Sequence, residues 1–405
     1  MRFHWFLPTA SDGRSLTVGT RGTHGPENAA DDAARVTADR FRAPTIRYLT
    51  QIAQAAEANG FEAVLTPTGT RCEDAWLTCA ALARETERLR FLVAFRPGLI
   101  SPTLAAQQAS TLQRMSGGRL LLNVVTGGER DEQARFGDHQ GKADRYARTG
   151  EFLTVLRGAW GGEPFTFKGE HYDVVGATVL APPDPLPRLY FGGSSAEAGP
   201  VAARHTDTYL TWGEPPDQVA RKLSWIRELA RQEGRQVKFG IRFHVVTRDT
   251  SAEAWAAAER LLAGLDPAHV GRVQNLLAAS ESTGQARMSA LHERFRDGSW
   301  KASDLEIYPN VWAGVGLLRG GAGTALVGSH SEVADRIAEY ASLGIDEFVL
   351  SGFPHLEEAY MVGEGVLPEL RRRLAPEATA SPKPSTTPAA QAATRPRTPS
   401  APTST

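Results

Sequence analysis

The sequence has few cysteines and lacks metal-binding spacings. Its 405 residues include two cysteines, Cys72 and Cys79, which the pattern places on one helix. Seven residues at about 1.5 Å rise each put them roughly 10 Å apart, too far for a disulfide. No CxxC or CxxH spacing occurs, so we expect no cysteine-held metal. This cysteine usage is typical of a reducing compartment, and we expect a cytoplasmic protein.

Long apolar runs and an excess of one charge are also missing. The N-terminal apolar run is too short for a signal peptide or a membrane span. The 45 basic and 46 acidic residues give a net charge of −1, so we expect neither a nucleic-acid partner nor binding to an anionic membrane. H-E-x-x-H, Walker and nucleophile-elbow motifs are absent from the sequence, which weakens metal hydrolysis and phosphoryl transfer as functions.

Short apolar runs alternate with amphipathic stretches along most of the chain. Eight runs are predicted as strands, at residues 3–7, 63–66, 91–95, 120–125, 189–191, 208–211, 239–246 and 347–350. Such a pattern predicts a parallel sheet covered by helices. The count favours a (β/α)8 TIM barrel spanning residues 1–374. An open doubly wound sheet is the alternative, but no G-x-G-x-x-G follows the first strand.

Several segments do not fit the repeat. Residues 11–44 are predicted as a long first loop, and 164–175 as an inserted hairpin. Residues 308–329 carry many glycines around Arg319, which is typical of either a mobile lid or a surface loop. Residues 375–405 are rich in Pro, Ala, Ser and Thr, and we expect a disordered tail.

Polar residues at the carboxyl ends of the strands are the candidate site, because TIM-barrel active sites lie there. Arg242 and His244 are two apart on one strand and share a face. They could form an anion-binding pair or a buried salt bridge. Cys72 could be a nucleophile, a cofactor contact or a small core residue. Arg96, before a proline, reads as a solvated strand end.

A second group of residues could bind a phosphate and a heterocycle. The Gly-Gly-Ser-Ser sequence ending in Ser194 and Ser195 lies at a strand-to-helix junction, where it could cradle a phosphate or simply cap a helix. Tyr146 could donate to the same phosphate or pack in the core. Asn123 and Thr126 could contact the edge of a heterocycle or shape a turn.

Longer motifs identify a family. They occupy residues 6–9 (FLPT), 70–76 (TRCEDAW), 123–127 (NVVTG), 189–195 (LYFGGSS), 209–216 (YLTWGEPP), 240–244 (GIRFH), 312–328 and 351–360 (SGFPHLEEAY). With these stretches the chain resembles the bacterial luciferase-like flavin monooxygenases, and within them the FMNH2-dependent alkanesulfonate monooxygenases. The resemblance spans nearly all of residues 1–374.

The resemblance implies a TIM barrel that receives reduced FMN (FMNH2) from a separate NAD(P)H-dependent FMN reductase. With O2 as co-substrate, it oxidises the carbon next to a sulfonate, and the C–S bond breaks to give an aldehyde and sulfite. It also implies a homodimer or homotetramer. The residues that carry over around the sulfonate and the reacting flavin are Trp212, Arg242, His244, Arg319, Phe353 and His355, with Cys72 near the flavin. Those for the FMN phosphate are Tyr146, Ser194 and Ser195.

Three departures from the family pattern fall where substrate is selected. Ala10 replaces the usual histidine, Phe353 replaces the usual tyrosine, and the loop from Gly13 to Thr45 is longer. The substrate could therefore be another organosulfur compound or a specialised metabolite. The chain could also be an F420-dependent oxidoreductase or a non-catalytic flavin-binding protein. A protein of the latter kind should lack the site's arginines and histidine, which this chain retains.

Overall fold

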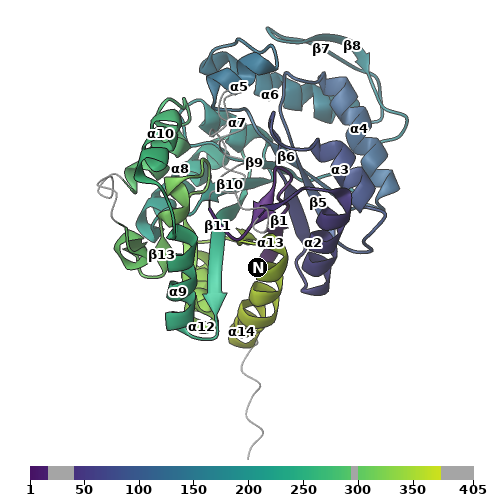
Figure 1. Ribbon diagram of the computed structural model, residues 1–405. Helices are drawn as coiled ribbons and strands as arrows, with labels where there is room; N and C mark the ends of the chain where they lie inside the picture. Colours follow the sequence, from purple (N-terminus) through teal and green to yellow (C-terminus); the bar gives the residue numbers. More distant parts are fainter. Residues whose placement is uncertain (17–40, 293–299, 375–405) are drawn as a thin grey trace, which may run out of the picture.

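Eight parallel strands close into a barrel in the computed structural model, which describes residues 1–16, 41–292 and 300–374. Around the ring they are β1 (Arg2–Phe6), β4 (Ala63–Thr66), β5 (Arg90–Phe95), β6 (Leu120–Val124), β9 (Leu189–Phe191), β10 (Thr208–Trp212), β11 (Lys238–Arg248) and β15 (Glu347–Ser351). Pairing of β11 with both β10 and β15 completes the circle (Figure 1). The predicted TIM barrel is confirmed, and each predicted strand is one of its eight.

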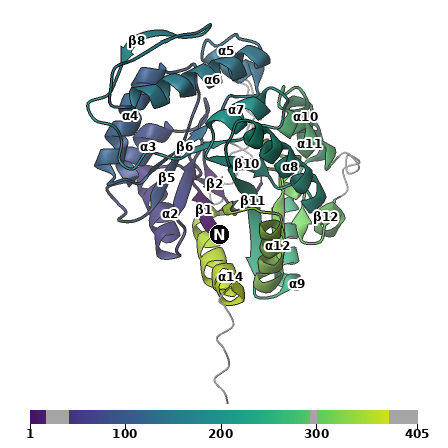
Figure 2. The ribbon, with the colours of Figure 1, turned by 180° about the vertical axis from the view of Figure 1, so that it is seen from behind.

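The helices between these strands surround the barrel. They are α2 (Ile46–Ala58), α3 (Ala75–Leu82), α4 (Pro102–Met115), α6 (Lys142–Ala159), α7 (Ala198–His205), α8 (Pro216–Gln232), α12 (His330–Ser342), and α13 (His355–Tyr360), which continues through a π-helical turn (Met361–Val366) into α14 (Leu367–Leu374). Side-chain caps set several starts: Asp74 accepts from the Leu77 N–H, and Ser329 and Glu332 form a capping box. Seen from behind, α6, α7 and α8 cover the far side (Figure 2).

Insertions lie outside this repeat. β7 (Phe165–Lys168) and β8 (Asp173–Ala177) form the predicted antiparallel hairpin. Helix α5 (Arg130–Arg135) follows β6, and α9 (Ser251–Leu262), α10 (Pro267–Ala278) and α11 (Thr283–Ala290) follow β11. β11 runs beyond the barrel and pairs there with β14 (Ala325–Ser329), next to β13 (Val311–Trp312) and β12 (Glu306–Tyr308). The sequence did not predict this outer sheet.

The segment 308–329, predicted as a lid, is therefore partly regular structure. Besides β13 and β14 it contains the 3-10 helix η4 (Gly314–Leu317), and residues 311–318 are buried. Two of its glycines allow close packing, because a Cβ on Gly323 would lie 2.8 Å from the Cα of Gly316. Closure of this segment over the site stays a prediction.

Both ends of the predicted first loop are fixed. β2 (Asp12–Gly13) pairs antiparallel with β3 (Phe41–Arg42), which brings the start and the end of the loop together. Residues 17–40 lie outside the described residues, and so does the predicted tail, 375–405.

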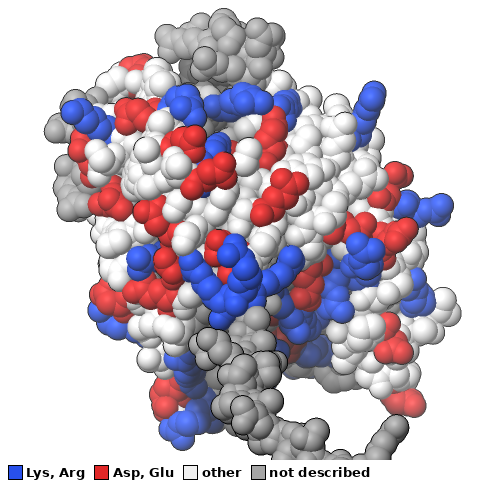
Figure 3. All heavy atoms as spheres, turned by 90° about the horizontal axis from the view of Figure 1, so that it is seen from below, with Lys and Arg blue, Asp and Glu red and all other residues white. Residues whose placement is uncertain are grey.

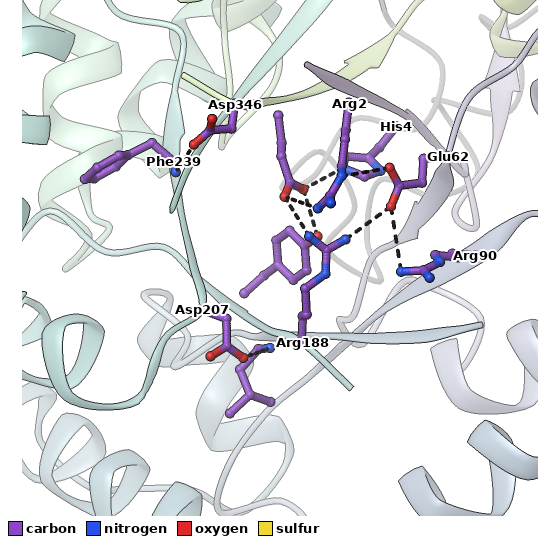
Figure 4. Close-up of polar contacts among 11 residues, drawn as sticks. Arg2, His4, Glu62, Arg90, Arg188, Asp207, Phe239 and Asp346 are labelled. Carbon is purple, nitrogen blue, oxygen red and sulfur yellow. Dashed lines mark hydrogen bonds and ion pairs between the residues drawn. The ribbon is translucent and has the colours of Figure 1, made fainter. Parts of the chain in front are cut away.

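The N-terminal end of the barrel is filled by an ion-pair network around Glu347. Its carboxylate accepts from His4 (2.8 Å), Tyr190 (2.7 Å) and Arg188 (3.0 Å), and Arg188 also reaches Glu62 (Figure 4). Burial alone would raise the pKa of Glu347, but the hydrogen bond and charge of His4, with the other donors, lower it to about 2.

An apolar layer separates this network from the other end of the barrel. Leu65, Leu92, Leu121 and Val349 form a small cluster of their own inside the ring. The next inward position of β11 after Gly240 is Arg242. The barrel interior thus changes from an acid-centred network, through aliphatic side chains, to a basic layer at the carboxyl ends of the strands.

The outer surface carries both signs of charge. Basic and acidic side chains are interspersed over the face seen from below (Figure 3). Within the described ranges, no helix has both the length and the apolar character needed to cross a bilayer. The absence of nucleic-acid and membrane partners stays a prediction.

Candidate active site

Arg242 lies in the part of β11 that belongs to the barrel, in register with Val349 of β15 and Trp212 of β10. Its Nη1 donates to the Phe243 carbonyl (2.8 Å) and the Ser351 hydroxyl (2.9 Å), and the guanidinium lies 4.4 Å from the centroid of the Phe6 ring. Among the described residues, no carboxylate forms an ion pair with Arg242. The buried salt bridge that the sequence left open is therefore not its role here.

His244 follows on the same face of β11 and is buried. Its Nδ1 shares a hydrogen bond with the Ser351 hydroxyl (2.7 Å), and its Nε2 is 3.1 Å from the Ala322 carbonyl. Burial, followed by the charges of Arg242 and Arg319, lowers the pKa of His244 well below its usual value. The lowered pKa favours the neutral imidazole, and both of its nitrogens are engaged in hydrogen bonds.

Arg319 completes this side from the segment after η4. Its guanidinium lies 4.5 Å from the centroid of the Phe353 ring, and that ring stacks on His244 at 5.1 Å and 20°. Phe353 is thus a platform between Arg319 and the two histidines, since it also meets His355 edge-on at 5.5 Å.

The charges of this pocket repel one another. Burial, and then the charge of Arg319, lowers the pKa of Arg242 to about 9. Burial likewise lowers the pKa of Arg319 to about 10, although Asp12 acts against this effect. Two half-buried guanidiniums at one end of the barrel create a positive potential there, which the carboxylate of Asp12 partly offsets. An anion that accepts from both would relieve the repulsion.

His355 faces the pocket from the start of α13 and is held by Asp12. Its Nδ1 and its backbone N–H meet the two oxygens of Asp12 at 2.9 and 2.8 Å. The Tyr48 phenol donates to Asp12 at 2.6 Å, and Arg42 donates to the Tyr48 oxygen at 3.0 Å. Sequence reasoning identified His355 and missed Asp12, whose partner is 343 residues away along the chain.

The predicted phosphate residues meet at the junction of β9 and α7. The Ser195 hydroxyl is buried with no hydrogen-bond partner among the described residues, and burial raises the pKa of the neighbouring Tyr146 phenol. Gly193 allows α7 to approach, since a Cβ there would lie 2.6 Å from the Ala198 Cβ and 3.3 Å from the Tyr146 oxygen. Tyr209 donates to the Gly193 carbonyl (2.5 Å). Ser194 is half-buried beside them, so these residues form one cluster.

Asn123 and Thr126 lie at the carboxyl end of β6. Asn123 is half-buried and pairs in register with Ala94 and Tyr190 on the neighbouring strands. Thr126 lies just after the strand and is buried. Both therefore lie at the end of the barrel that also holds Arg242 and His244.

Arg96 and Cys72 differ from their sequence-based interpretation. Arg96 is only 4% exposed and pairs with Glu132 of α5, so it is not a solvated strand end. Glu132 also accepts from the Thr70 N–H (3.0 Å), which fixes the loop after β4. Cys72 lies half-buried in that loop and not on the helix with Cys79. A helix missed by the sequence, α5, thus explains the burial of Arg96.

Trp212 ends β10 beside Arg242, its register partner on β11. Its ring lies against α11, because a Cβ on Gly284 would be 2.9 Å from it. Gln285 of α11 accepts from the Gly321 N–H (2.9 Å). The segment that carries Arg319 is therefore tied to α11 near Trp212, and nothing in the sequence pattern indicated this support.

Several buried polar atoms at this end of the barrel have no hydrogen-bond partner among the described residues. They are the Thr9 and Thr126 hydroxyls, the Nε2 of His355 and the Nε and Nη1 of Arg96. Buried polar groups are usually satisfied, so these atoms, together with the Ser195 hydroxyl, could bind the polar groups of a ligand.

The protein is a (β/α)8 barrel with a cluster of basic side chains, the candidate active site, at the carboxyl ends of its strands. The profile of the luciferase-like monooxygenase family matches residues 1–347. The chain belongs to that family.

Solved structures with the same fold agree at the level of architecture. A riboflavin lyase, determined with modified FMN and riboflavin, superposes with a TM-score of 0.72 at 21% identity, covering 92% of each chain. A long-chain alkane monooxygenase gives 0.70 at 19% identity, covering 92% of this chain and 91% of the other. An EDTA monooxygenase from Chelativorans sp. BNC1 gives 0.69 at 20%, covering 92% and 94%.

Proposed function

We propose that this protein is a two-component FMNH2-dependent monooxygenase that uses O2 to cleave the C–S bond of alkanesulfonates, giving an aldehyde and sulfite. The observation that carries the proposal is the position of two arginines at the same end of the barrel as His244 and His355. Arg242 lies over the Phe6 ring, and Arg319 lies over the Phe353 ring that both histidines contact. A sulfonate is a permanent anion with three oxygens, and guanidinium groups bind such groups through charge-assisted hydrogen bonds. Release of sulfite from such compounds would support sulfur acquisition.

The chain's own residues would divide the work of binding. Arg242 and Arg319 would hold the sulfonate, while Phe353 and Trp212 would pack against its carbon chain. Tyr146, Ser194 and Ser195 would bind the FMN phosphate, and Asn123, Thr126 and Cys72 would contact its ring. Reduced FMN, when bound, supplies the electrons that activate O2. His355 is the group that can accept or donate a proton at Nε2, which has no other partner among the described residues.

Closure of segment 308–329 over the pocket would exclude water. Arg319 lies on this segment and reaches the ring of Phe353, so ligand binding and closure would be coupled. A dry site strengthens the charge–charge contacts to the sulfonate.

The proposed reaction requires partners. A separate NAD(P)H-dependent FMN reductase would deliver reduced FMN as a diffusible substrate. A homodimer or homotetramer is our prediction for the assembly, and light scattering would measure it.

Sulfite release tests the function. The full chain would be assayed with FMN, NADPH and a flavin reductase against a series of sulfonates from methane- to octanesulfonate. We expect sulfite and the matching aldehyde, with a preference for chains long enough to contact Phe353, since Ala10 and Phe353 make this side apolar. A reaction without reductase is the control. No sulfite from any sulfonate would reject the proposal.

The competing functions give different outcomes in the same assay. Substrate-dependent O2 consumption with a sulfone or another organosulfur compound, but with no sulfonate, would favour the same flavin chemistry on a different substrate. Tight binding of reduced F420 in preference to reduced FMN would favour an F420-dependent oxidoreductase.

A further inference from the structure

Two imidazoles share the pocket, and their surroundings differ. Both nitrogens of His244 have neutral partners, Ser351 and Ala322, and its nearest charges are positive. His355 has a carboxylate on Nδ1, whereas its Nε2 is buried with no partner among the described residues. Two groups of the same type in contrasting environments mark a division of acid–base roles.

We propose that Asp12 is a positioning residue that keeps the proton of His355 on Nδ1 and makes His355, not His244, the imidazole that gains and loses a proton in the pocket. The carboxylate is 1% exposed and accepts four hydrogen bonds, from the Nδ1 and the backbone N–H of His355, from the Tyr48 phenol and from the Gly13 N–H. With Nδ1 as the donor, the lone pair of neutral His355 lies on Nε2.

The carboxylate is itself held as an anion. Burial would raise the pKa of Asp12, but the charge of His355 and the hydrogen bonds from His355 and Tyr48 lower it. Burial and the charge of Asp12 raise the pKa of Tyr48, so its phenol stays protonated and donates. Arg42 steadies Tyr48 and binds Glu357 of α13 through two hydrogen bonds (2.5 and 2.7 Å).

The charged groups around His355 determine whether its imidazole binds a proton more or less readily. The carboxylate of Asp12 on β2 contacts the His355 ring directly. The cationic or titratable groups on its other side are His244 of β11 and Arg319 after η4, which both lie against the Phe353 ring that His355 meets edge-on. Glu357 is already neutralised by Arg42 and Arg14. Asp12 is therefore the nearest negative charge that can stabilise His355 when its Nε2 takes up a proton.

The geometry also links His355 to the first loop. Asp12 and Arg42 stand on β2 and β3, the paired ends of the long loop, and both reach the start of α13. The residue that orients the imidazole thus stands directly before the loop, Gly13 to Thr45, that is longer than the family pattern.

The first test is histidine NMR on the full chain without flavin, which does not depend on the proposed activity. With 15N-labelled histidine, and His355→Ala to assign the signal, we expect the Nδ1–H tautomer. In Asp12→Asn the pH midpoint of His355 should fall by about 1–2 units, because a nearby carboxylate has an effect of that size on an imidazolium.

Tyr48→Phe is the matched variant with the opposite prediction. Removing the phenol concentrates charge on Asp12, so the His355 midpoint should rise, by a few tenths of a pH unit. If Asp12 had a merely structural role, the pH midpoint of His355 would be unchanged in both variants, or it would shift in the same direction in both. An Nε2–H tautomer in the unmodified protein, or an unchanged midpoint in Asp12→Asn, would overturn the proposal. If Asp12→Asn does not fold, the tautomer and Tyr48→Phe still decide it.

A pH profile of sulfite release then connects the dyad to turnover, and this step rests on the proposed function. His355→Ala should remove one limb of the pH profile. In Asp12→Asn that limb should move to lower pH, and kcat should change more than KM. Loss of sulfite release in the unmodified protein would reject the proposed function and leave the NMR result standing. A limb that stays in place in Asp12→Asn would reject the role of Asp12 in turnover.

Discussion

Replacing Arg242 with methionine should weaken sulfonate binding without unfolding the protein. Methionine keeps an apolar chain over Phe6 but removes the charge and the donors to Ser351 and Phe243. A charge-assisted hydrogen bond to an anion contributes about 1.5–3 kcal/mol. We therefore expect KM for the sulfonate to rise about 10- to 150-fold.

Stability should change little, because two effects oppose each other. The variant loses two close hydrogen bonds from the charged guanidinium to neutral acceptors, each contributing about 1.5–3 kcal/mol. It also removes a charge that burial and Arg319 both disfavour, as the lowered pKa of Arg242 indicates. Steady-state kinetics of sulfite release and a thermal unfolding curve would be measured on the same preparation.

Arg248→Met is the matched control on the same strand. Arg248 pairs with the buried carboxylate of Glu358 at 2.7 and 3.0 Å, beyond the barrel. Its loss should lower the free energy of unfolding by up to about 3 kcal/mol, since a buried charge loses its partner, and leave the sulfonate KM unchanged. An unaltered KM in Arg242→Met, or an equal KM change in both variants, would refute the assignment of Arg242 as the anion-binding residue.

Three further predictions concern other parts of the molecule. Phe353→Leu removes the ring beneath Arg319 and should raise the sulfonate KM about fivefold, as a cation–π contact of about 1 kcal/mol implies. Tyr146→Phe should weaken reduced FMN binding about five- to tenfold in a fluorescence titration. Glu347→Gln should lower the unfolding temperature. Because the folded pKa of Glu347 is depressed to about 2, its contribution is present above about pH 4.5 and lost as pH falls toward 2. The stability of Glu347→Gln should therefore fall less steeply between about pH 4.5 and 2 than that of the unmodified protein. An equally steep fall in both proteins would contradict the prediction.

The sequence predicted the barrel because each strand is a short, nearly continuous apolar run. Such runs are typical of strands buried on both faces, and glycines and polar turns separate them clearly. The outer strand β14 escaped this reasoning because its glycine-rich surroundings resemble a loop. There the glycines serve close backbone packing, as the contact between Gly316 and Gly323 shows.

The site was predicted where a residue's position on a strand determines its direction. Arg242 and His244 share an inward face by the period of two. Asp12 and Arg96 could not be found this way, because their roles depend on partners brought by other segments, His355 and Glu132. An acidic residue directly before a glycine in the first loop was the only local sign of Asp12.

The ion-pair network around Glu347 has a consequence for how the proposed ligands would reach Arg242. Together with the aliphatic layer above it, the network fills the barrel interior at the N-terminal ends of the strands. A substrate and a flavin would therefore both approach from the carboxyl ends, and the molecule that binds closer to Arg242 would have to enter first.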